Sequence, residues 1–196
     1  MGRKLVVQQF VTIDGVMQAP GTKEEDTRGG FDYGGWQLPY YDGIIVESML
    51  ERYAAADSLL FGRRTYENFA AYWPSAPDDG NPFVKEMNRF VKYVVARQPV
   101  DLSWENSFQI HPPVPEAIGQ LKRQPGKDIL VLGSGELVQT LVEHRLVDEF
   151  VLMVAPLVLG KGKRLFEGNL PKQELKLVSS KNSGTGVAIL TYACNG

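Results

Sequence analysis

Short apolar runs alternate with amphipathic segments along this 196-residue chain, and the alternation limits the folds open to it. Runs rich in aliphatic residues predict strands, whereas segments with apolar residues three and four apart predict helices. Their alternation favours a largely parallel sheet covered by helices, so the predicted fold class is α/β. We predict strands at 5–13, 58–61, 93–96, 129–132 and 149–155, and helices within 42–57, 64–73, 82–91, 115–124 and 136–145.

The C-terminal part of the chain departs from this alternation. The segments "ELKLVSS" and "VAILTYA" flank "KNSGTG", whose small residues suit a hairpin loop, so an antiparallel C-terminal hairpin is expected. Two long loops are predicted at 19–39 and 73–82, and both are candidates to cover a site. Length and composition predict one domain over residues 1–196.

Charge and cysteine content narrow the classes of partner. The chain has 21 basic and 23 acidic side chains and no long run of one sign, which argues against nucleic-acid and membrane partners and favours a small-molecule substrate. The single cysteine, Cys194, excludes an intrachain disulfide and a cysteine-based metal site, and it fits a reducing cytoplasm. The first apolar run is too short for a signal or a membrane span. We therefore expect a cytoplasmic protein without a metal.

Two glycines stand where a buried-type strand meets a helix, in "DILVLGSGELVQTLVE". Backbone N–H groups at a helix start attract an anion, and the missing β-carbons of Gly133 and Gly135 let a phosphate approach the backbone. A tight structural turn explains the same glycines equally well. Val138 occupies the place of the third glycine of the dinucleotide fingerprint, so the motif alone leaves both interpretations open.

A second strand-to-helix junction, in "DSLLFGRRTYENF", adds charge. Arg63 and Arg64 offer planar sets of donors suited to phosphate, and Thr65 lies near the helix start after Gly62. The alternative is a surface arginine pair with a helix cap. A third junction, in "YVVARQP", places Arg97 after another strand, where a solvated arginine is the alternative. Ligands of open parallel sheets bind at the carboxyl ends of the strands, so the three junctions are predicted to converge on one dinucleotide.

The segments "VTIDGVMQ", "DSLLFGRRTYENF", "KYVVARQP", "ILVLGSGELVQTLVE" and "VDEFVLMVAPLVLGKGKRLF" occur in the order seen in the dihydrofolate reductase superfamily. The chain most resembles the branch that includes the reductase domain of the bifunctional riboflavin-biosynthesis deaminase/reductase. The zinc signature of a deaminase is absent from the sequence. The resemblance implies a three-layer α/β/α dihydrofolate-reductase-like fold, with a mostly parallel central sheet and a C-terminal antiparallel hairpin. It also implies NADPH as cofactor and a homodimer.

The resemblance also implies roles for individual residues. In the family's reductases, a carboxylate on the first helix holds the substrate ring; Asp42 and Glu47 are the candidates here, and for each a solvated helix residue or N-cap is the alternative. The substrate is expected to be a pterin-like or phosphoribosylamino-uracil-like heterocycle of folate or riboflavin metabolism. Alternatives to the reductase are a non-catalytic nucleotide- or pterin-binding homodimer and an assembly subunit. The positions implied to contact the cofactor are Met17, Gln18, Gly62, Arg63, Arg64, Thr65, Arg97, Gly133, Ser134, Gly135, Glu136 and Leu137.

Overall fold

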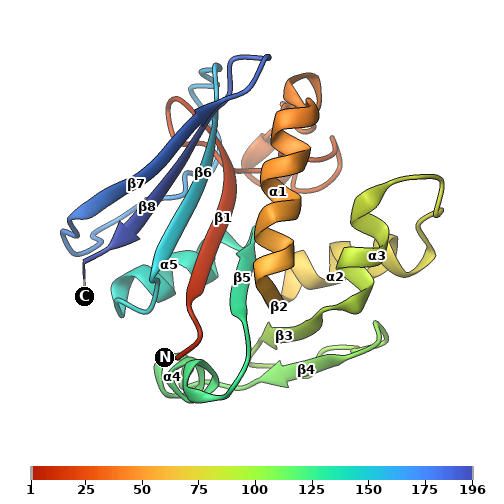
Figure 1. Ribbon diagram of the computed structural model, residues 1–196, viewed down its shortest axis with the longest axis vertical. Helices are drawn as coiled ribbons and strands as arrows, with labels where there is room; N and C mark the ends of the chain where they lie inside the picture. The colour runs from red at the N-terminus through yellow and green to blue at the C-terminus, as the bar shows by residue number, and fades with distance from the viewer. Residues whose placement is uncertain (1, 196) are drawn as a thin grey trace.

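A computed structural model describes residues 2–195 and contains one mixed eight-stranded sheet (Figure 1). The strand order is β4-β3-β2-β5-β1-β6-β8-β7. The first six strands in this order are parallel, β8 is antiparallel to β6, and β7 is antiparallel to β8. The strands are β1 (Leu5–Thr12), β2 (Ala56–Gly62), β3 (Val91–Val95), β4 (Ser107–Ile110), β5 (Asp128–Leu132), β6 (Glu149–Ala155), β7 (Leu175–Asn182) and β8 (Ala188–Cys194).

Five α-helices cover the two faces of the sheet within the described residues. Ile45 of α1, Tyr66 of α2 and Met87 of α3 belong to one buried cluster, whereas Ile118 of α4 and Val138 of α5 belong to a second cluster. The sheet therefore separates two helical layers, and the predicted three-layer α/β/α fold is confirmed. The helices are α1 (Gly43–Ala55), α2 (Arg63–Tyr72), α3 (Pro82–Arg89), α4 (Val114–Arg123) and α5 (Gly135–Glu143), with short 3-10 turns at Arg28–Gly30, Leu38–Tyr40 and Trp73–Ser75.

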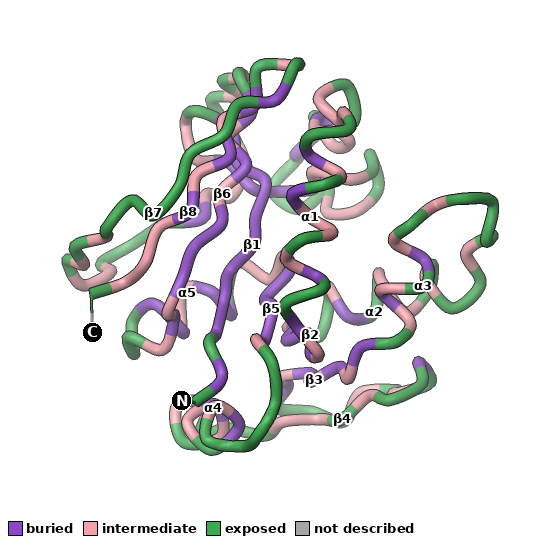
Figure 2. The backbone as a smooth tube through the Cα atoms, viewed as in Figure 1, coloured by how far each residue is buried: buried purple, intermediate pink, exposed green. Residues whose placement is uncertain are grey.

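β1 is the central strand around which both layers pack. All eight of its residues are buried, as the purple tube in Figure 2 shows. Side chains alternate between faces along a strand, so Val6 and Phe10 join the cluster under α1, whereas Val7 and Val11 join the cluster under α4 and α5. Burial on both faces is typical of a parallel strand that is covered by helices on each side.

β4 is the strand that the sequence analysis missed. It has four residues, forms the edge of the sheet, and keeps Phe108 exposed, so neither length nor apolar character marks it. β3 begins at Val91 rather than at 93, because the fully buried Lys92 extends the strand. Its ammonium group donates to the carbonyl oxygens of Asn88 and Glu105, both at 2.9 Å.

The long loop at 19–39 is partly folded into the core rather than lying wholly in solvent. Phe31 and Trp36 are buried in the cluster that also contains Phe10 and Ile45. The indole N–H of Trp36 donates to the carbonyl oxygen of Gln18 at 2.8 Å, which ties the end of the loop to its beginning. The loop is thus held against the carboxyl end of β1.

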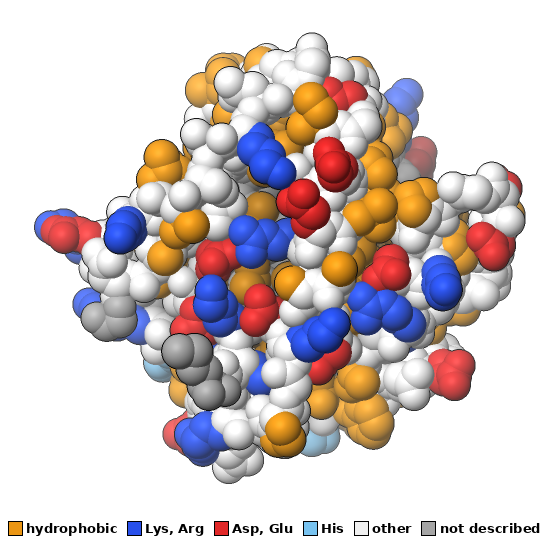
Figure 3. Space-filling model, viewed as in Figure 1, with side chains coloured by type: hydrophobic (Ala, Val, Ile, Leu, Met, Phe, Trp, Pro, Cys, Tyr) orange, Lys and Arg blue, Asp and Glu red, His pale blue; other side chains and the backbone are white. Residues whose placement is uncertain are grey.

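Charge is distributed without a dominant sign on the face that carries α1. Basic and acidic side chains are interspersed over that face (Figure 3). Among residues 2–195, no helix combines the length and apolar character that crossing a membrane requires.

Candidate active site

The carboxyl ends of adjacent parallel strands bring the predicted glycine turns together. The N–H of Gly62 donates to Oγ of Ser134 at 2.7 Å, which joins the β2–α2 turn to the β5–α5 turn. The N–H of Gly133 donates to Oε1 of Gln9 in β1 at 3.1 Å. Turns that are far apart in the sequence therefore lie side by side at one edge of the sheet.

Both glycines of the β5–α5 turn are tightly packed. Gly133 has a φ of +65°, and a β-carbon added to it would lie 3.0 Å from Cγ2 of Thr65. A β-carbon on Gly135 would lie 2.9 Å from Sδ of Met17. Glycine is needed at Gly133, where φ is positive and Thr65 of α2 lies close, whereas a β-carbon at Gly135 would only require the flexible Met17 side chain to move. The structural interpretation therefore accounts for Gly133, and a ligand site requires further observations.

The starts of α2 and α5 provide such an observation. Asp42 caps α1 by accepting the N–H of Ile45 at 3.0 Å, whereas neither Gly62 nor Ser134 accepts a first-turn N–H of its helix through a side chain. Amide donors without a side-chain cap, together with the helix dipole, favour an anion at each start. Because the two turns are hydrogen-bonded to each other, both helix starts open at one place.

The predicted arginines lie around this place. Arg63 and Arg64 are exposed in the first turn of α2, and Nη1 of Arg64 lies 3.5 Å from Oε1 of Glu136 in the first turn of α5. Arg97 is exposed just beyond β3, whose last residue pairs with the last residue of β2. Leu137, the remaining residue predicted in this turn, is buried under α5. Nε of Arg63 lies 3.6 Å from Oε1 of Glu67, one turn further along α2. The arginines therefore border the same edge, and Arg63 and Arg64 each face an exposed glutamate there.

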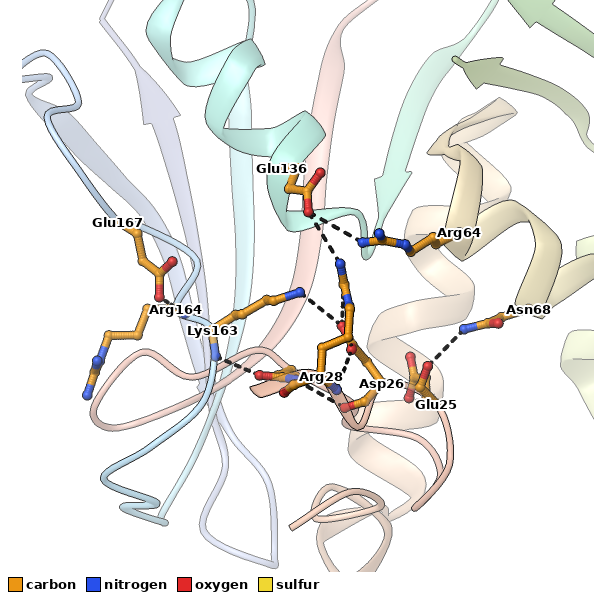
Figure 4. A network of polar contacts seen from close by, with 10 residues as sticks. Glu25, Asp26, Arg28, Arg64, Asn68, Glu136, Lys163, Arg164 and Glu167 are labelled. Atoms are coloured by element: carbon orange, nitrogen blue, oxygen red, sulfur yellow. Dashed lines mark hydrogen bonds and ion pairs between the residues drawn. The ribbon is translucent and has the colours of Figure 1, made fainter. Parts of the chain in front are cut away.

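An ionic network links the loop at 19–39 to the start of α5 (Figure 4). Asp26 pairs with Arg28 and lies 3.3 Å from Nζ of Lys163, and Arg28 in turn lies 3.5 Å from Oε1 of Glu136. The hydrogen bonds from Arg28 lower the pKa of Asp26 to about 2. Asp26 therefore stays ionised near neutral pH, and two guanidinium groups, those of Arg28 and Arg64, face one Glu136 carboxylate.

Glu25 is a half-buried carboxyl in the same loop. Its Oε2 accepts the N–H groups of Gly21 at 2.8 Å and Thr22 at 3.4 Å, and its carbonyl oxygen accepts Nδ2 of Asn68 in α2 at 3.3 Å. Burial raises the pKa of Glu25 despite those hydrogen bonds. The loop thus reaches across to α2 and carries an acid that holds its proton to higher pH than a surface glutamate does.

Met17 and Gln18 are positioned by the segment that follows β6. The N–H of Met17 donates to the carbonyl oxygen of Lys163 at 2.9 Å, and Oε1 of Gln18 accepts the N–H of Lys163 at 2.9 Å. The amide nitrogen of Gln18 donates to the carbonyl oxygens of Asp26 and Arg28. Met17 therefore contacts the glycine turn, whereas the buried Gln18 side chain holds two loops together.

The two predicted catalytic carboxylates lie on or beside α1 in different settings. Asp42 accepts the N–H of Ile45 and, through Oδ2, the N–H of Gly184 at 2.7 Å, so it caps α1 and ties it to the β7–β8 turn. These bonds, that from Ile45 foremost, lower the pKa of Asp42. Glu47 is exposed on α1, outside the buried set that includes Ile45 and Ser48. The structure therefore places Asp42 as an N-cap and Glu47 in solvent.

Several residues of this region escaped the sequence analysis. Gln9 holds the glycine turn, and Asp26 and Arg28 build the network over it. The adjacent pair Gln8 and Gln9, inside the strand predicted at 5–13, was an available signal, because amides buried in a strand need partners. The Asp26 network joins residues that are distant in sequence and leaves no periodic pattern.

Solved structures establish the class of fold. The structure of a putative riboflavin biosynthesis protein from Shewanella sp. PV-4 matches this chain with a TM-score of 0.71 and 20% identity over all of both chains. Dihydrofolate reductase from Enterococcus faecalis, complexed with NADP(H), matches with a TM-score of 0.59 and 15% identity over all of both chains. The protein has a dihydrofolate-reductase-like fold of the kind found in riboflavin-biosynthesis reductases.

The sequence comparisons identify the family. Residues 3–189 match the model of the RibD C-terminal domain, so the chain belongs to the RibD C-terminal domain family. The uncharacterized protein YyaP of Bacillus subtilis is 34% identical over 196 residues, covering 99% of this chain and 96% of YyaP. The uncharacterized protein YwjB of the same organism is 27% identical over 189 residues, covering 96% of this chain and 97% of YwjB. The resemblance stated from the motifs is thereby confirmed.

Proposed function

We propose that the protein is an NADPH-dependent reductase that transfers a hydride to a small heterocyclic substrate. The observation that carries this proposal is the meeting of the α2 and α5 starts, without side-chain caps and bordered by Arg63 and Arg64. Such an edge fits the phosphates of a dinucleotide. Membership of the RibD C-terminal domain family and the NADP(H) complex of the Enterococcus faecalis reductase support the same cofactor.

Different residues of this chain would contact different parts of the cofactor. The amides after Gly62 and Ser134 and the guanidinium groups of Arg63 and Arg64 would hold the pyrophosphate. Arg97, at the neighbouring strand end, would hold the adenosine phosphate that distinguishes NADPH from NADH. When bound, the cofactor supplies a hydride from its reduced nicotinamide. Met17 packs against the glycine turn and would limit water beside the reacting ring.

A proton must also reach the reduced substrate. Asp42 is a poor donor near neutral pH, because its pKa is lowered and its oxygens are engaged by Ile45 and Gly184. Glu25 is better suited, because burial raises its pKa and its loop is anchored to α2 through Asn68. We therefore add Glu25 to Glu47 and water as the proton sources to be tested.

The proposal is tested in two stages with purified protein. First, NADPH is expected to raise the melting temperature, and the double variant R63A/R64A is expected to lose most of that rise. Second, loss of the reduced nicotinamide absorbance is followed with dihydropterins and aminopyrimidinones as substrates. Binding without oxidation would instead support the non-catalytic nucleotide-binding alternative. No response to NADPH far above a typical dissociation constant would refute both.

A further inference from the structure

One carboxylate, that of Glu136, is shared by two arginines that come from different sides of the candidate site. Nη1 of Arg28, in the loop at 19–39, and Nη1 of Arg64, in the first turn of α2, each lie 3.5 Å from Oε1 of Glu136. Figure 4 shows both guanidinium groups pointing toward this oxygen. Glu136 itself lies in the first turn of α5, where the helix dipole also favours a negative charge. An anionic group of the protein therefore occupies the place where two cations and a helix start meet.

Arg28 is held in a fixed orientation by contacts that use only part of its guanidinium group. Its Nε donates to Oδ1 of Asp26 at 2.7 Å, and its Nη2 pairs with Oδ2 of the same carboxylate. The buried amide of Gln18 donates to the carbonyl oxygens of Asp26 and Arg28 at 3.0 and 2.9 Å, which fixes the backbone of this part of the loop. The remaining nitrogen, Nη1, is the one directed at Glu136. Asp26 and Gln18 therefore present one edge of the Arg28 guanidinium group to the start of α5.

The contacts to Glu136 are weaker than the contact between Arg28 and Asp26. A separation of 3.5 Å exceeds the roughly 2.7–2.9 Å of a strong charge-assisted hydrogen bond. The Glu136 side chain is 80% exposed, so water and salt screen its attraction for both arginines. A pyrophosphate carries more charge than one carboxylate and offers several acceptor oxygens to a guanidinium group. A bound pyrophosphate is therefore expected to replace Glu136 as the partner of these arginines.

We propose that Arg28 is a further cofactor-binding residue, and that Glu136 competes with the cofactor phosphates for Arg28 and Arg64. In the ligand-free protein, Glu136 links the loop at 19–39 to α5 across the edge where the pyrophosphate is proposed to bind. When the pyrophosphate binds, both arginines exchange the Glu136 carboxylate for phosphate oxygens. The loop then contacts the cofactor directly through Arg28. The inference rests on the proposed function, because it concerns how the same site binds and releases its cofactor.

A glutamate beside a bound dinucleotide has an alternative role, which is to accept a hydroxyl group of the cofactor ribose. That role requires NADPH binding to weaken when the carboxylate is removed, whereas competition requires NADPH binding to strengthen. Glu136 lies in the first turn of its helix, where phosphates bind, and its Oε1 faces two guanidinium groups. The geometry therefore favours competition, and the sign of the change in affinity separates the two roles.

The test measures dissociation constants for NADPH and, independently, for inorganic pyrophosphate by titration calorimetry. The variants are E136Q, R28A and the double variant R28A/E136Q. E143Q is the matched control, because it removes the same charge from an exposed residue of the same helix, about 10 Å further along. Hydrogen exchange of peptides that cover residues 22–32 reports the link between the loop and α5.

E136Q is expected to bind NADPH and pyrophosphate about three- to tenfold more tightly than wild type, and E143Q to bind them as wild type does. The gain in E136Q should shrink as the salt concentration rises. R28A should weaken binding of both ligands at least about threefold, and the loss should persist in the E136Q background. Loop exchange should be faster in ligand-free E136Q than in ligand-free wild type, and NADPH should slow it in both. E136Q keeps the test valid if R28A misfolds.

Weaker or unchanged NADPH binding by E136Q would overturn the competition, and equal loop exchange in ligand-free E136Q and wild type would overturn the link to α5. If Arg28 only neutralises Glu136, R28A/E136Q will bind NADPH as E136Q does, and that result would overturn the assignment of Arg28. A protein that ignores NADPH but binds pyrophosphate more tightly as E136Q would refute the proposed function and keep this inference. Wild type and E136Q that bind neither ligand would refute both.

Discussion

Ser134 combines a favourable contact with an unfavourable backbone conformation, and two substitutions separate them. Its φ of 62° and ψ of 56° lie in the left-handed region, which costs a residue with a β-carbon about 1 kcal/mol relative to glycine. Its Oγ accepts the Gly62 N–H at 2.7 Å. Alanine removes the hydrogen bond and keeps the strain, whereas glycine removes both.

The expected free energies of unfolding follow from these two contributions. Loss of the bond to a partly buried N–H costs about 1–2 kcal/mol, so S134A should be less stable than wild type by that amount. S134G regains about 1 kcal/mol from the relieved backbone and should lie close to wild type. With a slope of about 2 kcal/mol per molar urea, S134A should shift the unfolding midpoint by about 0.5–1 M.

Affinity for NADPH should behave differently from stability. Both variants release the tie between the β2–α2 and β5–α5 turns, so both should bind NADPH more weakly by a similar factor. Urea unfolding followed by tryptophan fluorescence and titration calorimetry measure the two quantities. Equal stability of S134A and S134G would refute the claim of backbone strain at Ser134. Wild-type NADPH affinity in both variants would refute the role of the tie.

Further predictions concern charge at the site and in the core. R63A/R64A should weaken NADPH binding at least tenfold, about 1.4 kcal/mol. R97A should weaken the binding of NADPH but not the binding of NADH. Titration calorimetry measures both affinities. Burial lowers the pKa of Lys92 from 10.5 to about 8. Between pH 8 and 10.5 the unfolded chain therefore binds more protons than the folded protein. The free energy of unfolding should rise by up to about 3 kcal/mol over that range. Urea unfolding across that range should show the rise in wild type but not in K92M. E25Q should lower kcat and alter the pH profile while leaving the NADPH dissociation constant unchanged, and an unaltered profile would exclude Glu25 as the proton source.

The sequence predicted most strands, helices and turns, because each of these elements is recognised from its own residues. A strand such as 129–132 is recognised from its own apolar residues, and the glycines that follow mark a turn without knowledge of any partner. The order of the motifs then supplied the family. The short edge strand β4 was lost because its residues are half exposed and it lacks an apolar run of its own.

The site was predicted in outline, and its unpredicted parts depend on contacts between distant segments. The junctions at Gly62 and Gly133 were identified, and the structure places them side by side. Arg28 was not identified, because its partner Glu136 is 108 residues away and nothing in the sequence of an exposed loop names such a partner. Asp42 was ambiguous because the same residue type serves as helix cap and as catalytic acid, and only the Gly184 contact shows how both its oxygens are used.

The amino and carboxyl ends of the strands differ in how completely their polar groups are paired. This difference indicates at which end a ligand binds. At the amino ends of the strands, Arg3 pairs with Asp57, Lys122 with Asp148, and Arg52 with Glu149. At the carboxyl ends, α2 and α5 begin without side-chain caps. Open donors persist at one edge when a ligand compensates for them in the bound state. NADPH should therefore slow amide hydrogen exchange most in the first turns of α2 and α5, and exchange along the amino edge should change little. Equal slowing of exchange at both edges would contradict a cofactor site at the carboxyl edge.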